Sequence, residues 1–124
     1  MGIAGAGLVR EIDGSLPEHL REWWTRDLWC LHSPGWWRRH WERTGIMDID
    51  LADTMPDGWQ RWLDWHRVVA PDNEAEIKAL EADRGSYLGY VRVVGRRKHG
   101  VTLAEPVVSV PAQYAKKPLL RSEK

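Results

Sequence analysis

The chain has 124 residues, with 18 basic and 18 acidic side chains and a formal net charge of zero. This balance excludes a generally basic nucleic-acid-binding protein, and a hydrophobic content of 43% excludes a wholly disordered chain. No apolar run approaches the roughly 20 residues of a membrane-spanning helix, and a single cysteine, Cys30, excludes an internal disulfide. We therefore expect a cytoplasmic protein.

The first predicted element is a strand at Gly2–Val9, an apolar run without alternation that is typical of a strand buried on both faces. Its glycines also suggest a dinucleotide-binding loop, but that loop needs a strand before the glycines and a helix after them. Next, Ser15–Glu18 has the pattern of a capping box with a first-turn proline. Apolar residues follow at helical spacing, so we expect a helix from Leu16 to Trp29.

A second helix is predicted from Pro34 to Thr44. Ser33 is a favourable N-cap residue, the proline after it suits the first turn, and Gly45 supplies a left-handed stop. Trp37 and Trp41 are four residues apart, so we expect this helix to bury them on one flank.

The next segment, Ile46–Leu51, predicts a half-exposed strand near a sheet edge. Met47, Ile49 and Leu51 alternate with two aspartates, which puts the three apolar side chains on one face.

Two further helices and a third strand complete the predicted order. Asp57 opens a helix that Pro71 ends, and one side of it carries Trp59, Trp62, Leu63, His66 and Val69. Asp72 caps a shorter helix, closed by Gly85. The segment Tyr87–Val94 is rich in tyrosine and valine and has one charge, which predicts a central strand. The remaining basic segment, residues 100–124, is predicted to be an extended tail.

The aromatic composition is unusual, because there are nine tryptophans, all between Trp23 and Trp65, and no phenylalanine. Core packing explains a helical flank of tryptophans, but such a flank can also form a wall for an apolar or ring-shaped ligand. The mixed aromatic and basic run at 36–41 is typical of some nucleic-acid surfaces, but Glu42 follows it directly and an amphipathic helix explains it better. The histidines show no metal-ligand spacing, and no nucleophile motif or phosphate loop is present, so these residues alone indicate no catalyst and no metal.

Five segments carry a resemblance to a known family: Gly2–Asp13, His32–Ile46, Leu51–Trp59, Tyr87–Arg97 and Pro111–Arg121. Together they resemble the C-terminal part of a class I S-adenosylmethionine-dependent methyltransferase. In that family seven strands run in the spatial order 3-2-1-4-5-7-6, and the seventh is antiparallel. The resemblance implies an α/β fold with a partial Rossmann-like sheet, in which Ile3–Val9, Tyr87–Val94 and Ile46–Leu51 are strands 5, 7 and 6.

The resemblance also implies what this chain lacks. The family binds S-adenosylmethionine on its first four strands, and we expect those strands to be missing from this chain. Residues 1–99 would then be the C-terminal portion of the methyltransferase domain, expected to bind no cofactor alone. We expect a small-molecule acceptor, no nucleic acid and no membrane as partners. The edge at residues 2–9 is expected to pair with a second copy, as a homodimer, or with the missing N-terminal half.

The resemblance places the acceptor beyond the carboxyl ends of the parallel strands. Those ends lead into Arg10–His32 and Asp53–Trp62, both rich in tryptophan. The candidate acceptor-binding residues are Trp23, Trp29, His32, Trp59, Trp62 and His66. In a complete enzyme the acceptor's nucleophile would attack the sulfonium methyl group, and one of the two histidines could take its proton. The alternative is a non-enzymatic tryptophan-rich module that binds carbohydrate or a partner protein.

Overall fold

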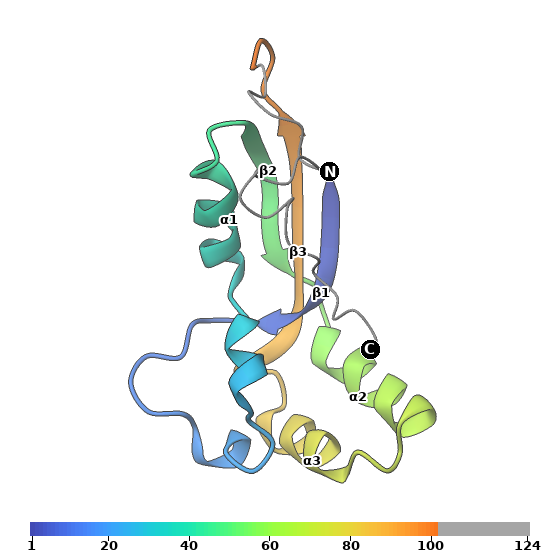
Figure 1. The fold of residues 1–124 in the computed structure, drawn as a ribbon. Helices are drawn as coiled ribbons and strands as arrows, with labels where there is room; N and C mark the ends of the chain where they lie inside the picture. Colours follow the sequence, from blue (N-terminus) through green and yellow to red (C-terminus); the bar gives the residue numbers. More distant parts are fainter. Residues whose placement is uncertain (102–124) are drawn as a thin grey trace, which may run out of the picture.

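The computed structural model describes residues 1–101, which form an α/β fold with a three-stranded sheet and three α-helices (Figure 1). The strands are β1 (Gly2–Leu8), β2 (Met47–Thr54) and β3 (Leu88–Arg97), in the order β1-β3-β2. Strand β3 runs antiparallel to both neighbours. The predicted central position of the third strand and the edge position of the second are therefore confirmed. The predicted burial of the first strand on both faces is wrong, because β1 is an edge strand that is buried only at Gly7 and Leu8. Within residues 1–101, no helix is long and apolar enough to cross a bilayer.

One face of the sheet is covered by α1 (Pro34–Glu42), which begins and ends close to the predicted bounds. The side chain of Ser33 accepts from the amide of Trp36, as its N-cap role requires. Trp37 and Trp41 pack against the buried side chains of Val91, Val93, Met47 and Ile49. This helix is thus amphipathic in the predicted sense, with both tryptophans half-buried against the sheet.

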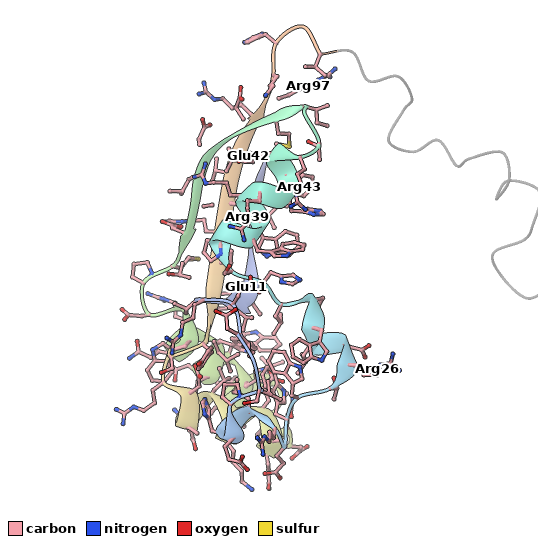
Figure 2. The ribbon with its side chains drawn as sticks, turned by 90° about the vertical axis from the view of Figure 1, so that its left-hand side faces the viewer. Glu11, Arg26, Arg39, Glu42, Arg43 and Arg97 are labelled. Carbon is pink, nitrogen blue, oxygen red and sulfur yellow. The ribbon has the colours of Figure 1, made fainter. Side chains whose placement is uncertain are left out.

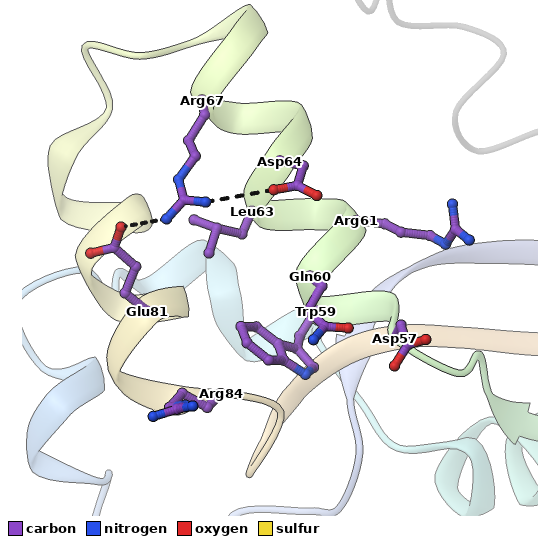
Figure 3. Close-up of a pocket in the computed structure, with 9 residues that line it drawn as sticks. All are labelled: Asp57, Trp59, Gln60, Arg61, Leu63, Asp64, Arg67, Glu81 and Arg84. Carbon is purple, nitrogen blue, oxygen red and sulfur yellow. Dashed lines mark hydrogen bonds and ion pairs between the residues drawn. The ribbon is translucent and has the colours of Figure 1, made fainter.

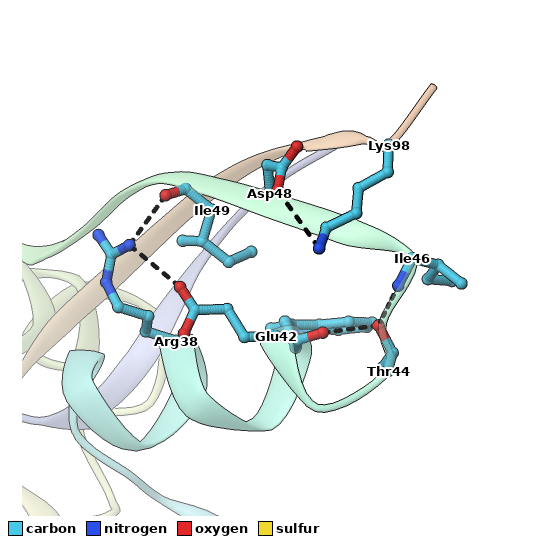
Figure 4. A network of polar contacts seen from close by, with 8 residues as sticks. Arg38, Glu42, Thr44, Ile46, Asp48, Ile49 and Lys98 are labelled. Atoms are coloured by element: carbon cyan, nitrogen blue, oxygen red, sulfur yellow. Dashed lines mark hydrogen bonds and ion pairs between the residues drawn. The ribbon is translucent and has the colours of Figure 1, made fainter. Parts of the chain in front are cut away.

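A β-bulge in β2 corrects the predicted facing of Leu51. Ile49 pairs with Gly95, but Leu51 pairs with Val94, so Asp50 is an extra residue in the register. The bulge turns Leu51 to the face opposite Met47 and Ile49, because successive side chains alternate. At this point Arg38 of α1 donates to the carbonyl of Ile49 at 2.8 Å, which ties the helix to the strand (Figure 4).

The larger core lies at the carboxyl ends of β1 and β2, where α2 (Gly58–Val69) and α3 (Glu74–Asp83) pack (Figure 1). Leu20, Leu80 and Leu88 are fully buried there. Two details of the predicted helices are wrong. Val69 is exposed, and α3 is capped by Asn73, whose side chain accepts from the amide of Glu76.

The predicted helix from Leu16 to Trp29 is also wrong. The chain forms two short 3-10 turns, Glu18–Leu20 and Arg26–Cys30, joined by irregular backbone. Glu18 pairs with Arg21 and makes no capping bond. Packing overrides helix propensity here, because the turns let Leu20 and Trp23 enter the core while Trp24 packs beside it. The predicted tail, 100–124, lies outside the described residues except for its first two.

Replacing Val91 by Asp tests the central position of β3. Val91 is 5% exposed and lies between two strands, so an unpaired carboxylate there costs several kcal/mol, a large part of a typical stability of about 5–15 kcal/mol. We expect the variant to be insoluble or unfolded by circular dichroism. Val94→Asp, on the same strand at an exposed position, is the control and should fold. A folded Val91→Asp protein would contradict the assigned sheet order.

Candidate functional site

The directions of β1 and β2 bring their carboxyl ends to the same end of the sheet. Because β1 and β2 are each antiparallel to β3, they run parallel to one another, and their carboxyl ends lie at the same end. The segments that follow them, Val9–Ser33 and Met55–Val69, gather there with α3 (Figure 1). In open α/β sheets ligands bind beyond the carboxyl ends of parallel strands, and here β1 and β2 are parallel to one another although each pairs with the antiparallel β3.

Three histidines at this end are each paired with a carboxylate. His32 Nδ1 lies 3.3 Å from Glu11, His19 Nε2 lies 2.8 Å from Asp83, and His66 Nε2 lies 2.6 Å from Glu76. A hydrogen bond to a carboxylate fixes the orientation and tautomer of an imidazole, and a histidine that accepts a proton needs both to be fixed. The same hydrogen bond also satisfies the ring nitrogen of a histidine with a purely structural role. The solvent exposure of the two side chains therefore has to distinguish the two roles.

The pair formed by His66 and Glu76 belongs to the core. Oε1 of Glu76 accepts from the indole of Trp62 at 2.8 Å as well as from His66. All three side chains are largely buried, and together they join α2 to α3. Asp83 is similar, since its carboxylate also accepts from the amides of Tyr87 and Leu88. The carboxylates of Glu76 and Asp83 therefore both hold parts of the fold together.

Glu11 and His32 lie beside β1, and theirs is the pair in which both side chains are partly exposed, since His19 is 31% exposed but its partner Asp83 is fully buried. Glu11 accepts from the amide of Ser33 at 2.7 Å, and the carbonyl of His32 accepts from the amide of Leu8, the last residue of β1. Burial raises the pKa of Glu11, but the hydrogen bonds from Ser33 and His32 outweigh it, so the pKa lies below its usual range. Figure 2 shows Glu11 near the N-terminal end of α1.

An aromatic column continues from His32 along α1. The ring of His32 stacks on that of Trp36, with 3.7 Å between the ring centroids. Trp36 stacks in turn on His40, with 4.8 Å between the centroids. Arg39 and Arg43 flank the column (Figure 2). Because both faces of Trp36 are occupied, a nucleobase has no free indole face to stack on here.

A shallow pocket of about 650 Å³ lies on the outer side of α2 and α3 (Figure 3). Trp59 forms part of its wall and rests on Gly85, where a Cβ would lie 2.5 Å from the indole. Arg67 is paired with Asp64 and Glu81, whereas Arg61 and Arg84 have no ion pair within residues 1–101. The pocket carries charges of both signs, from Asp57, Asp64 and Glu81 as well as from the three arginines, so its lining does not select the charge of a ligand.

The six sequence-predicted residues do not share one pocket. Trp23 and Trp62 are buried in the core and meet edge to face at 5.9 Å, and His66 is joined to Trp62 through Glu76. His32 stands in the aromatic column at the end of β1. Trp29 is 53% exposed and packs on Trp24. Only Trp59 lines the 650 Å³ pocket.

The sequence reasoning missed the carboxylates. Glu76 carries a signal, since it stands three residues after the true N-cap Asn73. Glu11 has none beyond following a strand. Among residues 1–101, no group of three or more metal-ligating side chains is close enough to hold a metal ion.

Comparisons of the sequence with protein-family models and curated proteins, and of the fold with solved structures, find no match.

The charge of Glu11 should make stability depend on pH. A lowered folded-state pKa means that its contribution is present above the ordinary value of 4.5 and is lost as the pH falls through the folded value. We expect Glu11→Gln to lower the urea midpoint at pH 7, and to lower it by less at a pH below 4.5. Glu18→Gln, at an exposed pair, is the control. An equal deficit at both pH values would show that the carboxylate charge is not involved.

Proposed function

We propose that this chain forms the acceptor side of a class I S-adenosylmethionine-dependent methyltransferase, with β1, β3 and β2 as strands 5, 7 and 6 of its sheet. One observation carries the proposal: the strand order β1-β3-β2, with an antiparallel strand between two parallel ones. This order supports the family assignment because consecutive strands more often pair directly, whereas here the last strand inserts between the first two.

The cofactor site does not fit the described residues. The glycines of Gly2–Leu8 lie inside a strand that is paired with β3, and β2 and β3 are not followed by a glycine-rich loop and a helix within residues 1–101. The proposal therefore assigns cofactor binding to another segment or chain, which would pair along β1. Residues 1–101 supply acceptor binding and orientation.

Among the candidate residues, His32 supports an acid–base role best. It is held by Glu11, its side chain is 24% exposed, and its backbone is fixed to the carboxyl end of β1. His66 is less suited because Glu76 and the core enclose it. Trp59 lines a separate pocket on α2 and α3 that does not include His32, so the two residues are alternative acceptor contacts and not parts of one site. The tryptophans of the core would exclude water from that end of the sheet.

The cofactor assignment is tested by calorimetry of the full chain with S-adenosylmethionine. We expect no binding in the micromolar range, because no cradle for the cofactor is formed by the described residues. Micromolar affinity would contradict the assignment. The DNA upstream of the Met1 codon is the second test: a reading frame for a strand, glycine-rich loop and helix supports the proposal, and its absence from the locus counts against it.

The alternative, a carbohydrate-binding module, rests on the two most exposed tryptophans, Trp29 and Trp65. If the methyltransferase proposal is correct, oligosaccharides should leave the tryptophan fluorescence unchanged, with emission at short wavelength from the buried indoles. Quenching that disappears in Trp29→Ala or Trp65→Ala would favour the module. Trp36→Ala serves as a control, because both faces of that ring are already covered.

A further inference from the structure

Along the outer edge of β1, alternate residues have backbone amides and carbonyls without a partner among residues 1–101. Met1 and Gly95 exchange hydrogen bonds, and the amide of Val9 donates to Tyr87, so odd-numbered residues of this strand face β3. Even-numbered residues consequently point their amides and carbonyls away from β3. The amide of Leu8 meets the carbonyl of His32, which closes that end of the edge. The amides of Gly2, Ala4 and Ala6 have no partner within residues 1–101.

An apolar cavity opens beside this edge. Helix α1 lies over β2 and β3, and no other element of residues 1–101 lies over the same face of β1 (Figure 1). The cavity measures about 110 Å³, and its lining is almost wholly apolar: Ile3, Gly5, Ala6, Trp37, Trp41, Val91 and Val93. A Cβ placed on Gly5 would have no atom within 4 Å, whereas Ile3 on the same face is 48% exposed. The strand thus carries an apolar projection, the side chain of Ile3, and two residues later an apolar gap, the open space over Gly5.

We propose that a second copy of this chain pairs with this edge, antiparallel, with Ala4 opposite Ala4 of the second copy. In this register Gly2 lies opposite Ala6 of the other copy, so every free amide meets a carbonyl and Leu8 keeps its bond to His32. Ile3 lies opposite Gly5 of the other copy, on the face that carries the cavity. Each isoleucine enters the cavity of the other subunit, and two three-stranded sheets become one continuous sheet.

The second copy is favoured over other occupants because the edge is complementary to itself. An isologous contact requires that one patch carry both the projection and the gap, and Ile3 and Gly5 meet this requirement. No charged side chain occurs from Met1 to Val9, and the strand has no proline or bulge to prevent pairing. This inference does not depend on the proposed function, although a cofactor-bearing segment would compete for the same edge.

Sedimentation of the full chain over a range of concentrations tests the association. We expect a reversible dimer with twice the mass of the chain. Ile3→Lys removes the projection, and Gly5→Val fills the gap. Each should raise the dissociation constant of the dimer at least about tenfold, because burying one aliphatic side chain contributes that much to affinity. Val94→Lys, an exposed position on the other face of the sheet, is the matched control and should leave it unchanged. Gly5→Val should fold, because its Cβ meets open space.

Disulfide trapping tests the register in a Cys30→Ser background, since Cys30 is exposed. Ala4→Cys should cross-link to itself, because hydrogen-bonded antiparallel pairs place Cα atoms about 5.5 Å apart. Ala6→Cys alone should not cross-link, but a mixture of Ala6→Cys and Gly2→Cys chains should.

Three results would overturn the proposal: a monomer at every concentration, a dimer that Ile3→Lys and Gly5→Val leave intact, or efficient cross-linking of Ala6→Cys with itself. None of these results bears on cofactor binding, so the failure of this inference and the failure of the proposed function are separate outcomes.

Discussion

The insertion of β3 between β1 and β2 is the constraint on which the rest of the molecule depends. Its register with both neighbours makes them parallel to one another, and that alone brings their carboxyl ends to one place. The tryptophan-rich segments follow those two ends, so they share a core with α2 and α3. On the opposite half of the sheet, Val91 and Val93 present one apolar face, which α1 covers. One strand therefore sets both cores.

Local signals in the sequence were sufficient to predict an element where neighbouring residues determine its backbone conformation and hydrogen bonds. Ser33 and Pro34 predict the start of α1, and the valine- and tyrosine-rich Tyr87–Val94 predicts the central strand. They failed where tertiary contacts compete with local preference. The segment from Leu16 to Trp29 has helical spacing, but the core needs Leu20 and Trp23 at positions that a continuous helix does not provide. The bulge at Asp50 is also invisible to alternation, because a single extra residue leaves both flanking patterns intact.

The site was less predictable than the fold, since its polar partners are distant in sequence. His19 meets Asp83 across 64 residues, and His32 meets Glu11 across 21. Spacing rules cover one or two helical turns and carry no information at such separations. Within α2 the periodicity did identify Trp62 and His66 as neighbours. Their joint partner, Glu76, comes from another helix, so the sequence showed the flank but not what satisfies its polar atoms.

Gly5 and Gly7 of β1 are glycines for different structural reasons. The difference bears on which kind of strand could pair with β1. Gly7 is required by the chain itself, because a Cβ there would lie 2.5 Å from Val91. Gly5 has no such neighbour, and a glycine inside a strand weakens it unless another backbone or side chain approaches closely. A partner strand explains Gly5 in either direction, but only the antiparallel two-fold arrangement sets it against Ile3 of an identical strand. A parallel strand from a cofactor-binding segment would bring its own side chain to that gap. The direction of pairing along β1 thus separates self-association from completion of a larger sheet.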